Sequence, residues 1–296
     1  MAVSSHDAVL VEETVALLAP ARGGLFVDCT VGLGGHSRAL LDAGASRILG
    51  IDRDPDALRA AAASLAPYGD RVELVHADFR DLARVLDDRG IAAVAGALAD
   101  LGVSSMQLDS GGRGFSFRRD EPLDMRMDRT QGPTVAELLV KVPEAELADL
   151  IYRYGEERYS RRIARAIVRA REEAAVSTTG QLAQIVRRAI PRRGHQRIDP
   201  ATRTFQALRI WANRELEGLE AFLGEAYRRL LVGARLAVIS FHSLEDRIVK
   251  HVFRALTAGE AAVRILTKRP IEAGEAEVSR NPRSRSAKLR AIERLA

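Results

Sequence analysis

The sequence predicts an α/β fold, in which a mostly parallel, Rossmann-like sheet is interrupted by an all-helical insert. Three observations predict it. Short apolar strands alternate with helices over about the first hundred residues, only helical patterns follow for about another hundred, and a clear strand then appears at 235–240. Strand-helix alternation at this spacing is typical of a parallel sheet covered by helices on both faces.

The expected strands of the first part are short and apolar, and they lie at 25–29, 47–51, 72–76 and 94–101. Between them, helices are expected at 37–43, 56–65 and 82–88. A loop of about twenty residues follows, from Leu108 to Arg129, and loops of that length in compact domains are usually functional or disordered.

Helical patterns dominate the next segment. Thr134 with Glu137, and Thr178 with Gln181, have the spacing of capping boxes at helix starts. Arg192 to Pro200 is expected to be a loop, and a single long helix is predicted from about Thr202 to Leu231. We therefore expect a first part of the sheet domain at 1–107, a helical insert domain at 108–200, and the second part of the sheet domain at 201–296.

Charge is concentrated in two places. The chain has 41 arginines and 4 lysines, a net charge of +5 and a pI of about 9.7. Between Arg153 and Arg203 there are 13 basic residues and 5 acidic ones, and between Arg280 and Ala296 there are 6 and 1. Because arginine is abundant throughout, this distribution indicates a polyanionic partner better than the total does.

Several classes of protein are disfavoured by the sequence. No run approaches ~18 consecutive apolar residues, so no membrane span and no membrane partner are expected. The first ten residues lack the basic-then-apolar pattern of a secretory signal, and Cys29 is the single cysteine, so a cytoplasmic location is expected. The histidines are scattered without metal-ligand spacing, and no metal is expected.

Polar residues and glycines follow the predicted strands at the edge where open α/β sheets bind ligands. Asp28 leads into a turn with glycines at 32, 34 and 35, and Asp52 ends the second strand. A carboxylate there can accept hydrogen bonds from ribose hydroxyls. Ser37 stands where a dinucleotide fingerprint has glycine or alanine, which favours S-adenosylmethionine over NAD as the cofactor. An ordinary strand-to-helix turn is the alternative.

The sequence also resembles a known family along its whole length. The segment from Asp28 to Ser37, DCTVGLGGHS, resembles the cofactor motif of the bacterial 16S ribosomal RNA cytosine-N4 methyltransferases, also called the MraW group or small subunit methyltransferase H. Further segments that resemble family motifs are Ser5–Leu10, Asp100–Ser105, Gly114–Phe117, Leu123–Asp128, Tyr154–Arg158, Ala201–Ile210, Ser240–Arg247 and Asn281–Ser286.

This resemblance implies a class I S-adenosylmethionine-dependent methyltransferase with a helical insert. The implied reaction is methylation of a cytosine N4 amine in 16S ribosomal RNA, in the decoding region, either on free RNA or on the assembled small subunit. The implied cofactor contacts are Gly34, Gly35, His36, Asp52, Phe79, Asp100 and Gln107. Met106 and Ala99 depart from what many members have, and both lie near Asp100 in the sequence.

Asp100 is the expected catalytic residue. The cytosine N4 lone pair is delocalised into the ring, so transfer needs in-line alignment and an acceptor for an amine hydrogen. A carboxylate at the end of the fourth strand suits that role, cofactor binding, or both, and a carboxylate that only caps the following loop is the alternative. Phe79 is expected to pack on adenine or to be a core residue. His242 is equally compatible with a structural and a catalytic role.

The insert is expected to recognise RNA. Phe115, Phe117 and the arginines 113, 118 and 119 suit stacking on unpaired bases, or a lid pinned to the core by its two phenylalanines. Arg161, Arg162, Arg165 and Arg169 share one predicted helix and are either a phosphate-binding face or a solvated one. Two alternative functions remain: an NAD-dependent oxidoreductase, and an RNA-binding assembly factor without catalysis.

Overall fold

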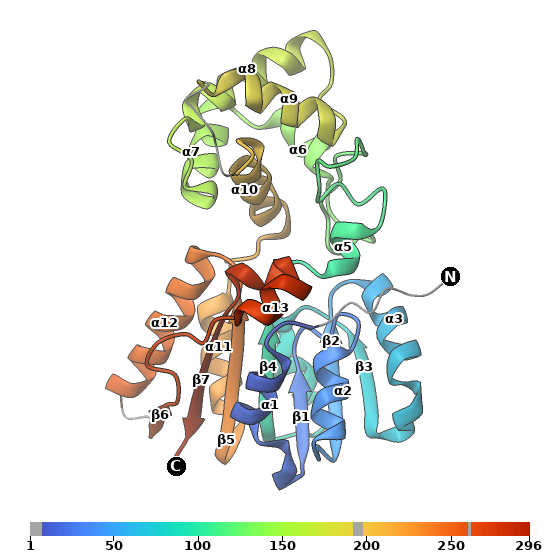
Figure 1. Ribbon diagram of the computed structural model, residues 1–296, viewed down its shortest axis with the longest axis vertical. Coiled ribbons are helices and arrows are strands. Elements are labelled where there is room, and N and C mark those ends of the chain that lie inside the picture. Colours follow the sequence, from blue (N-terminus) through green and yellow to red (C-terminus); the bar gives the residue numbers. More distant parts are fainter. Residues whose placement is uncertain (1–7, 192–197, 260–261) are drawn as a thin grey trace. The chain divides into compact units, whose positions relative to one another are not determined.

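The structure is a computed structural model, and it describes residues 8–191, 198–259 and 262–296. The predicted Ser5–Asp7 part of the opening motif and most of the 192–200 loop lie outside these residues. The chain divides into two compact units (Figure 1). The sheet unit comprises residues 1–102 and 216–296, and the helical unit comprises residues 103–215.

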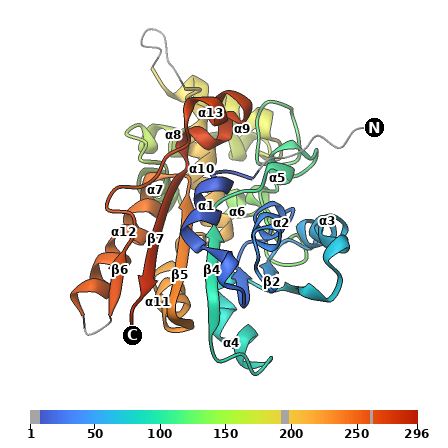
Figure 2. The same ribbon diagram turned by 60° about the horizontal axis from the view of Figure 1, so that its bottom comes forward.

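The sheet unit contains a single seven-stranded sheet with the order β3-β2-β1-β4-β5-β7-β6. The strands are β1 (Leu25–Asp28), β2 (Arg47–Asp52), β3 (Val72–His76), β4 (Val94–Asp100), β5 (Leu230–Ser240), β6 (Val263–Ile265) and β7 (Lys288–Arg294). The first five are parallel neighbours, whereas β7 runs antiparallel between β5 and β6 (Figure 2). The predicted Rossmann-like, mostly parallel sheet is confirmed.

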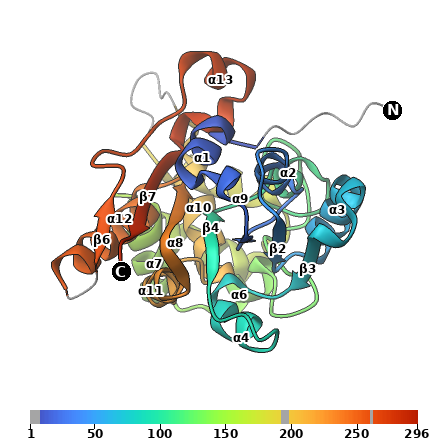
Figure 3. The ribbon, with the colours of Figure 1, turned by 90° about the horizontal axis from the view of Figure 1, so that it is seen from below.

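Helices cover both faces of this sheet (Figure 3). One buried cluster joins alternate strand residues such as Phe26, Ile48 and Leu98 to the first group of helices, α1 (Val11–Leu18), α2 (Gly35–Asp42) and α3 (Pro55–Leu65). The intervening strand residues, such as Val27 and Leu49, face the second group, α4 (Leu82–Asp87), α11 (Leu219–Arg228) and α12 (Ser243–Ala258). Successive side chains of a strand point to opposite faces of the sheet. Because helices cover both faces, both sets of side chains are apolar, and each strand is a continuous apolar run in the sequence.

Shorter elements complete the sheet unit. They are α13 (Glu275–Arg280) and the 3₁₀ turns η1 (Pro20–Arg22), η2 (Ala66–Arg71), η3 (Phe79–Asp81) and η4 (Pro282–Ser286). No helix among the described residues is long and apolar enough to cross a membrane.

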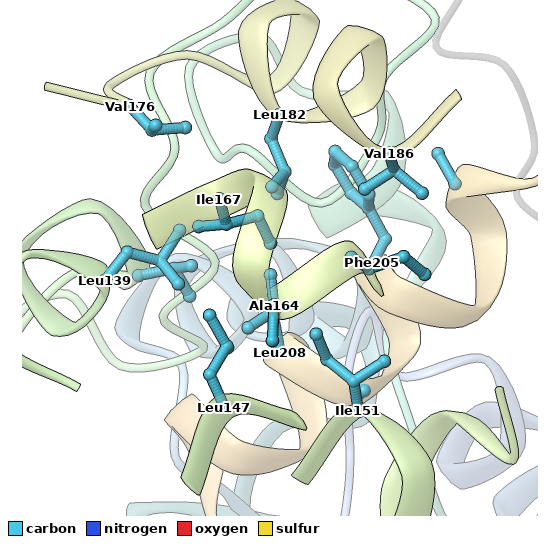
Figure 4. Close-up of a cluster of buried hydrophobic side chains, with 14 of the residues drawn as sticks. Leu139, Leu147, Ile151, Ala164, Ile167, Val176, Leu182, Val186, Phe205 and Leu208 are labelled. Atoms are coloured by element: carbon cyan, nitrogen blue, oxygen red, sulfur yellow. The ribbon is translucent and has the colours of Figure 1, made fainter. Parts of the chain in front are cut away.

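The helical unit has a core of its own (Figure 4). It contains α5 (Ser105–Asp109), α6 (Val135–Lys141), α7 (Glu144–Gly155), α8 (Ser160–Glu173), α9 (Thr179–Ala189) and α10 (Ala201–Asn213). Ile151, Ile167, Leu182 and Leu208 from four of these helices are fully buried together. The two predicted capping boxes are present at the starts of α6 and α9.

The predicted single helix from Thr202 to Leu231 is wrong. The chain forms two helices, α10 and α11, because Arg214 takes a left-handed conformation with φ 53°. The Glu215 N–H then donates to the Ile210 carbonyl over 3.1 Å, as in a helix-ending Schellman turn. Since α10 packs on α7, the helical unit extends to Glu215 and not only to the predicted Pro200.

The helical core predicts the stability of α6 variants. Leu139 is 1% exposed and its neighbour Val140 is 57% exposed. Leu139→Ala should lower the free energy of unfolding by about 2–5 kcal/mol, because it leaves a cavity in the core. Val140→Ala, the matched control in the same helix, should change it by less than about 0.5 kcal/mol. Urea denaturation of both variants measures the difference, and similar values would contradict the packing described.

Candidate active site

The turn after β1 joins the carboxyl ends of three parallel strands. Asp28 ends β1 and is buried, and its carboxylate accepts hydrogen bonds from the Ser37 hydroxyl at 2.7 Å and the Thr30 N–H at 3.2 Å. The Thr30 hydroxyl in turn accepts the Asp100 N–H at 2.6 Å, at the end of β4. Burial raises the pKa of Asp28 despite the nearby His36 and these hydrogen bonds. Asp28 is therefore a structural anchor of the turn.

Close packing around the turn favours glycine at two of its positions. Gly34 has φ 83°, and a Cβ there would lie 2.8 Å from the Ser64 hydroxyl and 2.9 Å from Leu65 in α3. A Cβ on Gly35 would lie 2.9 Å from that of Ala8. Gly34 precedes α2, whose first turn has no side-chain cap. The amide groups of that turn can therefore receive an anionic group of a ligand.

Asp52 ties the end of β2 to the same turn. Its carboxylate oxygens accept the Gly32 N–H at 2.8 Å and the Asp54 N–H at 2.9 Å. Each oxygen has a second lone pair, so the carboxylate can still accept hydrogen bonds from a ligand. Burial raises the pKa of Asp52 to about 6.

His36 and Asp100 face each other inside the site. His36 Nε2 lies 3.6 Å from Asp100 Oδ2, a distance typical of an ion pair and too long for a hydrogen bond. His36 is buried, whereas the Asp100 side chain is 24% exposed. Asp100 Oδ1 has no hydrogen-bond partner among the described residues. This oxygen is itself buried, so the exposed part of the Asp100 side chain belongs to its other atoms.

Phe79 follows β3 by three residues, and the chain there is tied to the end of β2 because the Ala77 N–H donates to the Asp52 carbonyl. Phe79 begins η3, and its ring packs at 59° against that of Phe222, with 4.8 Å between the ring centroids. The ring is only partly buried. Phe79 therefore packs on the core, and its packing on adenine stays a prediction.

Gln107 belongs to the helical unit, where its side chain has a structural partner. Its Oε1 accepts the Ser104 N–H at 3.0 Å, and its own N–H donates to the Ser104 hydroxyl at 3.2 Å. This capping box begins α5. The cofactor contact predicted for Gln107 stays a prediction.

The structure gives His242 a structural role. It caps α12, and its Nδ1 accepts the Glu245 N–H at 3.3 Å. Glu245 Oε2 accepts the N–H groups of Phe241 and His242 at 2.9 and 3.3 Å. His242 Nε2 lies 3.2 Å from Glu245 Oε1. This reciprocal capping box gives the SFHSLE segment a structural role at the start of α12.

Both phenylalanines of the predicted RNA-stacking loop pack within the helical unit. Phe115 is buried, and the Phe117 ring meets that of Phe205 edge-on at 4.7 Å. Arg113 is also buried and donates to the Met127 carbonyl at 2.9 Å. The structure therefore favours a loop pinned to the core over a loop that stacks on bases.

The sequence alone indicates no role for Thr30, and Ser37 bears there only on the identity of the cofactor. Thr30 links Asp28 to Asp100, and Ser37 closes the turn onto Asp28. The available signal is a threonine two residues after the buried strand-end aspartate and a serine near the start of the following helix. The bond between Thr30 and Asp100 depends on β4 lying beside β1, which local spacing does not reveal.

Carboxylates at the ends of β1, β2 and β4, a glycine turn and this strand order define a class I methyltransferase. The model of the MraW methylase family matches residues 3–295, and the chain belongs to that family. This membership confirms the predicted enzyme class and its methyl donor, S-adenosylmethionine, and contradicts the NAD-dependent alternative.

Similar proteins match over nearly the whole chain. The ribosomal RNA small subunit methyltransferase H of Pelobacter propionicus is 50% identical over 313 residues, covering 100% of both chains. The protein of the same name from Sorangium cellulosum is 52% identical over 290 residues, covering 98% of this chain and 91% of its own. A crystal structure of an rRNA methylase from Streptococcus thermophilus has a TM-score of 0.43 and 11% identity, covering 97% and 94%.

The pKa of Asp52 predicts how stability depends on pH. Burial raises this pKa from 3.8 to about 6, so the folded protein holds the proton more tightly than the unfolded chain. The resulting stabilisation is complete below about pH 3.8 and is lost as the pH rises through about 6. The free energy of unfolding of wild type minus that of Asp52→Asn should therefore decline across this window. Urea denaturation at several pH values measures it, and a constant difference would contradict the raised pKa.

Proposed function

We propose that this protein transfers the methyl group of S-adenosylmethionine to the N4 amine of a cytosine in 16S ribosomal RNA, in the decoding region. The relatives that match at about 50% identity over their full length are named as methyltransferases of small subunit ribosomal RNA. The choice of an amine as the methyl acceptor rests on Asp100, which ends β4. Its Oδ1 has no hydrogen-bond partner among the described residues.

Asp100 suits the chemistry of an amine acceptor. The lone pair of the cytosine amine is delocalised, and it becomes nucleophilic only as the nitrogen pyramidalises. A carboxylate oxygen that accepts one amine hydrogen favours that change and aligns the nitrogen with the methyl group. The Asp100 backbone is held by the Thr30 hydroxyl, so the carboxylate is positioned before substrate binds.

The remaining predicted contacts fit the parts of the cofactor. Asp52 would accept hydrogen bonds from the ribose hydroxyls with its free lone pairs. Phe79 would pack on adenine, and the turn at Gly34, Gly35 and His36 would pass the methionine portion. The carboxylates of Asp28, Asp52 and Asp100 also favour a positively charged sulfonium electrostatically.

The helical unit supplies a surface suited to RNA. Arg161, Arg165 and Arg169 are exposed on α8, and only Arg165 has a described acidic partner, Glu144 at 3.4 Å. A pocket between the α7–α8 turn and the start of α10 is lined by residues that include Arg158 and Tyr159. The Arg158 guanidinium lies 4.7 Å from the centre of the Tyr159 ring. Guanidinium and aromatic groups are those that bind phosphates and stack on unpaired bases.

Mass mapping of 16S ribosomal RNA tests the proposed function. RNA from cells that lack this protein should have lost one methyl group on a cytosine N4, and the wild-type gene should restore it. Purified protein should bind S-adenosylmethionine and not NAD in calorimetry. Unchanged RNA in the deletion strain would overturn the proposal, and restoration by a variant without catalysis would favour an assembly factor.

Asp100→Asn should separate catalysis from cofactor binding. The substitution keeps the size of the side chain and removes its charge, so turnover should fall about 100-fold or more while the Kd for S-adenosylmethionine changes less. Asp88→Asn, an exposed control in the same unit, should leave both unchanged. Single-turnover methylation and calorimetry measure the two effects. A proportional loss of affinity and turnover would make Asp100 a cofactor ligand only.

Neutralising Arg161, Arg165 and Arg169 together with glutamine should weaken RNA binding and flatten its salt dependence. Each lost phosphate contact should reduce the log–log slope by about 0.7–0.9. The Kd for S-adenosylmethionine should stay the same, because no residue assigned to the cofactor lies on α8. Filter binding of 16S ribosomal RNA at several salt concentrations measures the slope.

The matched control removes three exposed arginines of the sheet unit, Arg59, Arg84 and Arg228. This control changes the net charge by the same amount as the α8 variant, and it should reduce the slope of RNA affinity against salt concentration less than the α8 variant does. Equal slopes for the two triple variants would assign the α8 arginines to a solvated face, and would point to the basic segment around Arg283 and Arg285.

A further inference from the structure

His36 is a buried histidine without a hydrogen bond. It is the second residue of α2 and is 6% exposed. Neither Nδ1 nor Nε2 has a hydrogen-bond partner among the described residues. Buried polar groups are nearly always hydrogen-bonded, so an imidazole left this way calls for a chemical explanation.

Three carboxylates face this imidazole from three elements. Asp100 at the end of β4 lies 3.6 Å from Nε2, Asp28 ends β1, and Glu277 belongs to α13. Glu277 also accepts the Leu10 N–H at 2.8 Å. Burial opposes protonation of His36, but Asp100, Asp28 and Glu277 outweigh it, and the pKa of His36 is raised above 6.5. A proton that arrives on His36 is thus stabilised by charges already in place.

The proposed reaction releases one proton. The amine nitrogen forms a bond to the methyl carbon, the carbon–sulfur bond breaks, and its electron pair stays on sulfur. The product amine keeps one of its two hydrogens, so the other leaves as a proton. Asp100 accepts this proton on a carboxylate oxygen and must lose it again before the next turnover.

We propose that His36 is the group that takes this proton from Asp100, a role that rests on the proposed function. Rotation of the protonated Asp100 carboxyl group turns its O–H toward Nε2, and the neutral imidazole accepts the proton. The 3.6 Å between these groups closes to hydrogen-bond length in the substrate complex or is spanned by one water molecule, as catalytic contacts often are. His36 then passes the proton to solvent when the products leave.

The pH dependence of kcat tests this role. Only neutral His36 accepts a proton, so the kcat of the wild type should fall toward tenfold per pH unit on the acidic side, with a midpoint above 6.5. His36→Gln should lower kcat about 10- to 100-fold and remove this slope. Saturating S-adenosylmethionine and 16S ribosomal RNA keep the titration of Asp52 out of the measurement, since that residue is assigned to cofactor binding.

Imidazole rescue separates proton transfer from packing. His36→Ala leaves a space for free imidazole, which should restore kcat in proportion to its unprotonated fraction. Added imidazole should not raise the kcat of Asp100→Asn, which lacks the donor of the relayed proton. His36→Gln, with a comparable side-chain volume, gives the pH comparison even if the alanine variant fails to fold.

Three results would overturn the inference. A His36→Gln variant with a weakened Kd for S-adenosylmethionine but normal kcat and pH profile would make the imidazole a cofactor ligand. A lower kcat with the wild-type slope and no rescue would make it a packing residue. A wild-type enzyme that binds S-adenosylmethionine but does not methylate 16S ribosomal RNA would overturn the proposed function as well, and is seen before any variant is compared.

Discussion

The hydrogen bonds between the β1–α2 turn and the ends of the neighbouring strands hold the site together. The Thr30 hydroxyl accepts the Asp100 N–H at 2.6 Å, and the Gly32 N–H donates to Asp52 at 2.8 Å. The turn therefore fixes β4 on one side of β1 and β2 on the other. Because the parallel order places these three strand ends side by side, a short segment positions all three aspartates before any ligand binds.

In this site, hydrogen bonding to the protein distinguishes the supporting residues from the residues proposed to react. Asp28 accepts two hydrogen bonds from the turn and has a structural role. Asp52 accepts two backbone N–H groups and keeps lone pairs for a ligand. Asp100 Oδ1 and both nitrogens of His36 have no hydrogen-bond partner in the described chain. Leaving such atoms unpaired costs about 1–3 kcal/mol each, and these three atoms lie where the proposed proton transfer takes place.

Most of the fold and part of the site could be predicted from the sequence, for identifiable reasons. Strand alternation, the glycine turn and the capping boxes are local patterns, and all three are present in the structure. The sequence does not reveal the break between α10 and α11, because Arg214 takes the left-handed conformation at which glycine is usual. The sequence does not reveal the His242 cap, because only the folded geometry shows Nδ1 accepting the Glu245 N–H.

The helical unit shows why a count of charges overstates an RNA-binding surface. The sequence has an excess of eight positive charges between Arg153 and Arg203, but several of these arginines bind within the protein. Arg171 donates to the carbonyls of Leu139 and Val142, and Arg187 forms a bidentate pair with Asp199. Arg161 and Arg169 are exposed, and they have neither a carbonyl nor a carboxylate partner among the described residues. Since a guanidinium already bonded to carbonyls or carboxylates has less to offer a phosphate, recognition of RNA by this unit depends on a small part of its nominal charge.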